Sequence, residues 1–346
     1  IPILCKDFFI DEYQVYLARL SGGDAILLML SVLDDEQYLA LHKVADSLNM
    51  SVLTEVSNEQ EVSRALALNA SLIGINNRDL RDLSTDLATT ERLRQLIPND
   101  KVVISESGIY THKDVKRLAP LCDGFLIGSS LMAERDLEAA CRKVILGENK
   151  VCGLTRSQDA MAAYASGAVY GGLIFYPKSP RYVDIDCAKQ VTQSAPLAYV
   201  GVFVNAPLEQ VVDYAQSLKL AAVQLHGDEN SEYIQSLRKQ LPLGCEIWKA
   251  QAVKGELPKP LEGVDRHLYD TYSKSQKGGT GEAFDWSVLE TATVPFMLAG
   301  GLNPENIHAA LYRGANGLDL NSGVEASAGK KCQTKLQNAF SHIRNY

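Results

Sequence analysis

One segment of the chain occurs twice, at a constant offset of 193 residues. Residues 103–130 (VISESGIYTHKDVKRLAPLCDGFLIGSS) align without a gap on residues 296–323 (FMLAGGLNPENIHAALYRGANGLDLNSG). Each copy reads as an apolar strand, a glycine-containing loop, an amphipathic helix, a second apolar strand and a Ser-containing turn. Because the backbone N–H groups of such a turn bind anions, the repeat predicts two phosphate cradles.

The positions of these cradles indicate the fold class. Parallel (β/α)8 barrels commonly bind phosphate with the loops after strands 7 and 8, and each barrel needs about 200 residues. The chain has 346 residues, which is long enough for two domains with their own cores. We therefore predict an α/β protein with two tandem (β/α)8 barrels.

The number of apolar, β-rich runs differs between the two halves. The second half has eight candidate strands, which close a barrel: 150–154, 169–175, 198–204, 221–225, 246–250, 266–270, 295–299 and 316–320. The first half has six: 1–5, 24–30, 51–55, 71–76, 101–105 and 123–127. The repeat assigns the last two of these to strands 7 and 8. We therefore expect the first domain (1–147) to lack its first two βα units and the chain to be N-terminally incomplete, whereas the second domain (148–346) is a complete barrel.

Composition and charge argue against nucleic acids, membranes and metals as binding partners of this chain. The net charge of −8 is spread along the chain without a basic stripe, so nucleic acid is not an expected partner. No apolar run approaches the roughly 20 residues that a membrane span needs, and the N-terminus does not resemble a signal peptide. The seven cysteines form no CxxC pair and no regular spacing with His. We expect a cytoplasmic monomer that acts on phosphorylated small molecules and uses no metal or cofactor.

In the second half, the reactive residue types stand at the ends of predicted strands, where (β/α)8 enzymes place their catalytic groups. Cys152 ends the first of these strands, Asp270 ends the sixth, and Arg181 lies in the loop after the second. A thiol and a carboxylic acid on opposite sides of one mouth can act as general base and general acid. Cys152 is also compatible with a small buried hydrophobe, and Asp270 with a strand-end cap.

Three loops that favour anions surround the same predicted mouth. They are GGTG at 278–281, AGGLNPEN at 299–306 and NSGVE at 321–325. Glycine lets the backbone amides approach an anion closely. One such loop is a weak signal, but three around one mouth indicate a phosphate site.

The first half also has polar and charged residues at its predicted strand ends. They are Lys6, Glu55, Asn76, Arg78, Glu106, Ser107, Gly128 and Ser129. A single charged residue at such a position is usually a solvated rim group. Several that converge on one mouth favour acid–base chemistry, because a buried Lys beside carboxylates donates a proton while a neighbouring Glu accepts one.

The motifs of the second half, taken together, identify a family. VCGLT, FYPKSPRYV, VGVFVN, VQLHGDE, GGTGEAFDW, LAGGLNPENI and LDLNSGVE resemble phosphoribosylanthranilate isomerase over residues 150–346. The resemblance implies an Amadori rearrangement in which Cys152 is the base, Asp270 is the acid and Arg181 holds the anthranilate carboxylate. It also implies that backbone amides hold the phosphate, at Gly279, Gly301 and Ser322. His226 either lines the mouth or has a purely structural role.

The first half is similar to a second family. CKDF, LTEVSN, GINNRDL, ISESGI and FLIGSSLM resemble indole-3-glycerol-phosphate synthase over residues 1 to 147. By that resemblance Lys6 is the catalytic acid and Glu55 the base. The residues implied to orient the substrate are Asn76, Glu106 and Ser107, and those implied to serve its phosphate are Arg78, Gly108, Gly128 and Ser129. The chain departs from the family in having no Ser-Pro-Ser-Lys segment.

The two resemblances support each other, because the product of the isomerase is the substrate of the synthase. We therefore expect a bifunctional enzyme of tryptophan biosynthesis. Two alternatives remain open at this point: an isomerase with an inactive synthase half as structural support, and a non-catalytic phosphosugar-binding protein. A sugar isomerase of histidine biosynthesis is disfavoured, because it would place an Asp where Cys152 stands.

Overall fold

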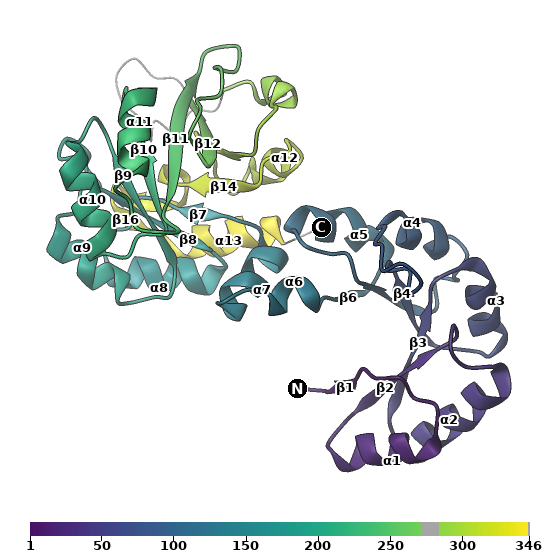
Figure 1. The fold of residues 1–346 in the computed structure, drawn as a ribbon. Coiled ribbons are helices and arrows are strands. Elements are labelled where there is room, and N and C mark those ends of the chain that lie inside the picture. Colours follow the sequence, from purple (N-terminus) through teal and green to yellow (C-terminus); the bar gives the residue numbers. More distant parts are fainter. Residues whose placement is uncertain (272–283, 345–346) are drawn as a thin grey trace. The chain divides into compact units, whose positions relative to one another are not determined.

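The computed structural model describes residues 1–271 and 284–344, and it divides the chain into two compact units, Ile1–Ala140 and Cys141–Tyr346 (Figure 1). In both units, strands alternate with helices along the chain, which is the pattern of parallel strands joined by crossover connections. No helix in the described ranges has the length and apolar character needed to cross a membrane.

The first unit contains one parallel sheet whose six strands pair in chain order. They are β1 (Leu4–Cys5), β2 (Ala25–Met29), β3 (Ser51–Val56), β4 (Leu72–Asn76), β5 (Val102–Glu106) and β6 (Gly124–Leu126). The connecting helices are α1 (Glu12–Leu20), α2 (Asp35–Ser47), α3 (Glu59–Ala67), α4 (Ala88–Arg94) and α5 (His112–Leu118), and α5 is followed by a 3₁₀ turn, η1 (Ala119–Leu121). After β6 come α6 (Ser129–Met132) and α7 (Leu137–Leu146). The prediction of six strands in this half is confirmed.

Local sequence explains where several of these helices begin. Asp11, Asp34 and Thr111 stand at the N-caps of α1, α2 and α5, and each side chain accepts a hydrogen bond from the backbone of the first turn. In each case the side chain of the third helical residue accepts a hydrogen bond from the backbone N–H of the cap residue, which completes a capping box. Residues on one face of the strands, including Ile26 and Leu28, pack in the core together with helix residues.

The second unit is a closed barrel of eight parallel strands, and β14 pairs with β7 to close it. The strands are β7 (Lys150–Val151), β8 (Tyr170–Ile174), β9 (Ala198–Phe203), β10 (Ala222–Leu225), β11 (Glu246–Val253), β12 (Arg266–Thr271), β13 (Phe296–Leu298) and β14 (Gly317–Leu320). The surrounding elements are α8 (Ser157–Ser166), α9 (Ile185–Thr192), α10 (Leu208–Ser217), α11 (Ser231–Arg238), the 3₁₀ segment η2 (Trp286–Thr291), α12 (Ile307–Leu311) and α13 (Gln333–Ile343). All eight predicted strands are present.

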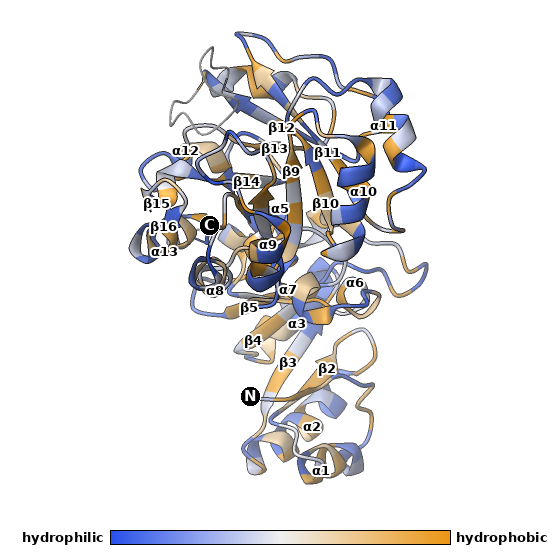
Figure 2. Cartoon of the chain, turned by 90° about the vertical axis from the view of Figure 1, so that its left-hand side faces the viewer, coloured by the Kyte–Doolittle hydropathy of each residue, from blue (hydrophilic) through white to orange (hydrophobic). Residues whose placement is uncertain are grey.

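The barrel has two separate apolar cores, because neighbouring residues on a strand face opposite sides. One core includes Trp248, Leu268 and Met297. The other and larger core includes Ile247 and Leu298 together with residues of the helices. Figure 2 shows the result: strands β9 and β10 are largely hydrophobic, whereas helices α10 and α11 carry hydrophilic residues.

The sequence repeat corresponds to a structural repeat. β5, α5 and β6 in the first unit match β13, α12 and β14 in the second, and the matched glycines Gly108 and Gly301 both have positive φ, at 74° and 65°. Each copy ends in a short helical turn, α6 or the 3₁₀ turn η3 (Ser322–Val324). One element was not predicted: a two-stranded antiparallel hairpin of β15 (Glu325–Ser327) and β16 (Lys330–Lys331) follows η3.

Candidate active sites

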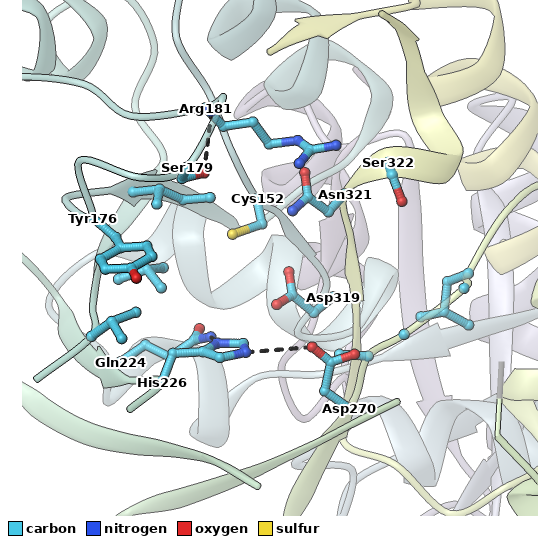
Figure 3. Close-up of a pocket in the computed structure, with 17 residues that line it drawn as sticks. Cys152, Tyr176, Ser179, Arg181, Gln224, His226, Asp270, Asp319, Asn321 and Ser322 are labelled. Carbon is cyan, nitrogen blue, oxygen red and sulfur yellow. Dashed lines mark hydrogen bonds and ion pairs between the residues drawn. The ribbon is translucent and has the colours of Figure 1, made fainter. Parts of the chain in front are cut away.

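In the barrel of the second unit, six of the predicted site residues line a single pocket at the C-terminal ends of the strands (Figure 3). They are Cys152, Arg181, His226, Asp270, Gly301 and Ser322. These residues are spread over 171 positions of the sequence, from 152 to 322, so only closure of the barrel brings them together. The seventh, Gly279, lies outside the described residues.

Cys152 is buried in the wall of this pocket. The strand β7 is shorter than predicted and ends at Val151, so Cys152 directly follows it, and its backbone N–H donates to the carbonyl of Leu320 at 2.8 Å. Burial raises the pKa of the thiol, and the nearby ammonium of Lys150 opposes this rise. A neighbouring cation is what a thiol needs in order to act as a base.

Asp270 and His226 face each other on the other side of the pocket (Figure 3). One oxygen of Asp270, Oδ2, lies 3.5 Å from Nε2 of His226. The other, Oδ1, accepts a hydrogen bond from the backbone N–H of Thr271 at 2.7 Å. The carboxyl group is therefore held in one orientation, with the thiol of Cys152 in the same pocket, as a paired acid and base require.

The guanidinium of Arg181 is fixed by a carboxylate from the unpredicted hairpin. Its Nε donates to Oε1 of Glu325 at 2.9 Å, and its Nη2 donates to Oε2 at 2.7 Å. The ammonium of Lys331 also donates to Glu325, at 2.8 Å. Burial alone would raise the pKa of Glu325, but the hydrogen bonds from Arg181 and Lys331 hold it below its usual value. The two hydrogen bonds to Glu325 thus hold the guanidinium of Arg181 in one orientation at the pocket wall.

The loop 299–306 of the predicted phosphate cradle has a backbone shape that suits anion binding. Gly300 and Gly301 have φ of 86° and 65°, and a Cβ on Gly300 would collide with Thr271 and lie 2.7 Å from Oδ1 of Asp270. The carbonyl of Gly301 accepts from the side-chain amide of Asn306 at 2.9 Å. The backbone N–H groups of Gly301 and Ser322 have no acceptor among the described residues. Both donors are therefore open to a ligand.

Polar residues inside the barrel were missed by the sequence reasoning. Lys150 is fully buried, and its Nζ donates to Oε1 of Gln224 at 2.9 Å and to Oδ2 of Asp319 at 2.7 Å. Gln224 and Asp319 line the pocket. Alternation along the strands was the available signal, because Lys150 and Gln224 precede Cys152 and His226 by two residues and therefore share their face.

In the first unit, the structure brings together the predicted acid and base. The Nζ of Lys6 lies 3.2 Å from Oε2 of Glu55 and 3.2 Å from Oε2 of Glu106. Asn76 donates from Nδ2 to Oε1 of Glu55 at 3.0 Å. Lys6 follows β1, whereas the three other residues belong to β3, β4 and β5, so the group gathers at the C-terminal edge of the sheet.

The two carboxylates of this group are buried, and burial changes the pKa of Glu106. Burial, followed by repulsion from Glu55, raises the pKa of Glu106 to about 7, although Lys6 acts in the opposite direction. Burial lowers the pKa of Lys6, but the attraction of Glu106 and Glu55 outweighs it and leaves the pKa raised. No side chain fits at Gly74, because the carboxylate of Glu106 occupies that space. The site therefore holds a charged donor, Lys6, beside a buried carboxyl group, Glu106, whose pKa lies near neutral pH.

The remaining predicted residues of the first unit lie around the same edge. Asn76 and Arg78 line a pocket formed by the loops after β3 and β4. Ser107 and Gly108 follow β5, and both have positive φ, at 66° and 74°. Gly128 is the N-cap of α6, which begins at Ser129 in the loop that follows β6. The sequence reasoning missed Asn77, a buried residue that ties α4 to β5 through Thr90 and Ser105.

Comparison with protein families gives two matches that together span almost the whole chain. The family model for indole-3-glycerol phosphate synthase matches residues 1–144, and the model for N-(5'-phosphoribosyl)anthranilate (PRA) isomerase matches residues 149–342. The tryptophan biosynthesis protein TrpCF of Vibrio cholerae is 57% identical over 346 residues, an alignment that covers 100% of this chain and 74% of the relative. TrpCF of Yersinia pestis is 55% identical over 100% of this chain and 72% of its own length.

Solved structures resemble the second unit. The crystal structure of phosphoribosyl anthranilate isomerase from Thermotoga maritima matches with a TM-score of 0.51 and 31% identity, and covers 58% of this chain and 100% of that one. The isomerase from Thermus thermophilus matches with a TM-score of 0.50 and 31% identity, over 57% of this chain and 98% of its own.

Proposed function

The chain belongs to the family of bifunctional tryptophan-biosynthesis enzymes that join an indole-3-glycerol phosphate synthase to a phosphoribosylanthranilate isomerase, and we propose which residues perform each reaction. The enzyme isomerises N-(5-phosphoribosyl)anthranilate to 1-(2-carboxyphenylamino)-1-deoxyribulose 5-phosphate and then closes the indole ring of that product. We assign the synthase to residues 1–147 and the isomerase to residues 148–346. The ranges of the two family matches support this division.

For the isomerisation, we assign Asp270 as the general acid and Cys152 as the general base. Protonation of the ribose ring oxygen by Asp270 breaks the C1′–O bond, and the anthranilate nitrogen forms a Schiff base at C1′. The thiolate of Cys152 then removes the proton from C2′, and the resulting enol amine tautomerises to the ketone. The observation that carries this assignment is the placement of both groups, buried, in one pocket with Arg181.

Arg181 and the backbone donors orient the substrate around these two groups. The guanidinium suits the anthranilate carboxylate, and the N–H groups of Gly301 and Ser322 suit the phosphate. We also assign Gly279 to the phosphate, on the sequence motif alone. The short distance between His226 and Asp270 favours a place for His226 in the site over a structural role alone.

For ring closure, we assign Lys6 as the acid and Glu55 as the base. The substrate ketone accepts a proton while the ring carbon attacks it, carbon dioxide leaves, and loss of the hydroxyl as water forms the indole. Contact of Lys6 with both Glu55 and Glu106 supports this assignment, because the same group must alternate between proton donor and ion-pair partner. Asn76, Glu106 and Ser107 orient the substrate, and Arg78, Gly108, Gly128 and Ser129 serve its phosphate.

Single substitutions in each unit test both assignments. Cys152→Ser and Asp270→Asn should each lower isomerase kcat by at least about 100-fold, the usual contribution of a positioned acid or base, and leave synthase activity on the isolated intermediate unchanged. Lys6→Met and Glu55→Gln should do the opposite. Each pair is the control for the other. Normal isomerase turnover in both Cys152→Ser and Asp270→Asn would show that the acid–base assignment is wrong.

A further inference from the structure

Lys150 lies inside the barrel between the two reactive sides of the isomerase pocket, the side with Cys152 and the side with His226 and Asp270. It lies on β7, yet its ammonium reaches Gln224 on β10 and Asp319 on β14, so it bridges the interior of the barrel. A lysine with no exposed surface is costly unless it is paired, and Asp319 pairs with it at 2.7 Å. Neither the proposed acid–base steps nor substrate binding has used this residue.

Lys150 lies close enough to Cys152 for its ammonium charge to stabilise the thiolate. The two residues point to the same side of the strand, and both pack over Gly172, where an added Cβ would lie 2.7 Å from the Cys152 sulfur and 3.0 Å from Cε of Lys150. Lys150 has two hydrogen-bond acceptors among the described residues, Gln224 and Asp319, so its third N–H is not used by them. Its positive charge favours the ionised form of the nearby thiol.

Other charged groups around Cys152 are already engaged. Lys331 of β16 donates to Glu325 and to both oxygens of Asn321, which uses its three N–H groups. Arg181 is held by Glu325, and Asp319 opposes ionisation of the thiol. His226 and Asp270 face each other across the pocket. Lys150 is therefore the cation best placed to stabilise the thiolate.

Lys150 also determines the orientation of the Gln224 amide. An ammonium only donates hydrogen bonds, so the amide oxygen of Gln224 faces Lys150 and its NH₂ faces Nδ1 of His226, at 3.1 Å. Nδ1 must then accept, which places the imidazole proton on Nε2, the atom that faces Asp270. If the imidazole of His226 were doubly protonated, its Nδ1–H and the NH₂ of Gln224 would face each other as two donors with no acceptor between them.

From these contacts we infer that Lys150 is a positioning residue for the isomerisation, which stabilises the Cys152 thiolate and, through Gln224, holds His226 in the neutral tautomer whose Nε2–H faces Asp270. The inference rests on the proposed roles of Cys152 and Asp270. Its two consequences are measurable without turnover, so they can fail or succeed independently of those roles.

The first test measures ionisation of Cys152 in the full chain. Alkylation by iodoacetamide is followed from pH 6 to 10, with the Cys152 peptide quantified by mass spectrometry. Because the rate below the midpoint is proportional to the thiolate fraction, a shift of the midpoint by one pH unit is read as a tenfold change in rate at a given pH. Because an opposite charge at this range shifts a pKa by about 1 to 3 units, Lys150→Met should raise the midpoint by that amount and lower kcat/KM at pH 7.5 by about 10- to 1,000-fold, with little change in KM.

Two further variants serve as the control for this test and as its replacement if Lys150→Met does not fold. Lys249→Met removes another buried lysine of a barrel strand, one that pairs with Glu229 instead, and it should leave the Cys152 midpoint unchanged. If Lys150→Met does not fold, Lys150→Met/Asp319→Asn removes both charges of the buried pair and should still raise the midpoint. An unshifted midpoint in the Lys150 variants would overturn the electrostatic part of the inference.

The second test reads the tautomer of His226 by ¹⁵N NMR of histidine-labelled enzyme at pH 8, with His226→Gln to assign its signals. The native enzyme should show a proton on Nε2. Gln224→Glu replaces the NH₂ donor by an acceptor, so the proton should move to Nδ1 or the ring should become doubly protonated. A native Nδ1–H tautomer, or an unchanged signal in Gln224→Glu, would overturn the role of Gln224.

Discussion

The buried carboxyl of Glu106 should make the first unit less stable as the pH rises. Its pKa is about 7 in the folded chain, against 4.5 for an ordinary glutamate. Between these two pH values the folded state holds one proton more than the unfolded state. The free energy of unfolding should therefore fall as the pH rises from 4.5 to 7. One pKa unit corresponds to about 1.4 kcal/mol, so the loss is about 3 kcal/mol.

Glu106→Gln removes this titration while keeping the shape of the side chain. At pH 8 the variant should be more stable than the native chain by up to about 3 kcal/mol, and near pH 4.5 the two should be alike. The variant should also lose most synthase activity, because the amide cannot keep the ion pair with Lys6 at 3.2 Å. Stability and activity would then change in opposite directions.

Hydrogen exchange in urea, read on peptides over β4 and β5 and corrected for intrinsic rates, isolates the first unit from the second. Glu91→Gln is the matched control, because Glu91 is a half-buried glutamate of the same unit and its pKa is lowered by a hydrogen bond from Arg117. This control should change stability by less than about 1 kcal/mol. A Glu106→Gln variant that is less stable than the native chain at pH 8, or that shares the native dependence on pH, would refute the role of this buried carboxyl.

Three further substitutions probe the second unit. Gly172→Ala should abolish isomerisation, because the new Cβ would lie 2.7 Å from the Cys152 sulfur and 2.9 Å from its Cα, and kcat/KM of the variant measures this. Glu325→Gln should raise KM for the isomerase substrate by about 10- to 100-fold with a smaller change in kcat. The reason is that Arg181 loses charge-assisted hydrogen bonds of about 1.5–3 kcal/mol. An unchanged KM would show that this carboxylate does not position Arg181. Arg266→Met, at the start of β12, should lower the melting temperature and leave kcat/KM intact, because the N-terminal face of a barrel serves stability. A fall in kcat/KM without a fall in melting temperature would contradict this.

The number and order of the strands were readable from the sequence, because each strand is a local apolar run between helical segments. The same reasoning placed Cys152 and Asp270 at strand ends, and the structure shows both in one pocket. Two details of the secondary structure were missed, in addition to the buried polar residues. β7 stops before Cys152, and the hairpin β15–β16 carries too few residues to give a periodic signal.

The local periodicity, the strand count and the repeat of strand, loop, helix and strand could all be read from the sequence alone. Only the tertiary structure decided which side chains meet inside the barrel: Lys150 contacts Gln224 and Asp319 across 74 and 169 positions of the chain. The physical reason is that alternation along a strand assigns each residue to a face, whereas the partner it meets on that face depends on how the strands tilt and close into a barrel.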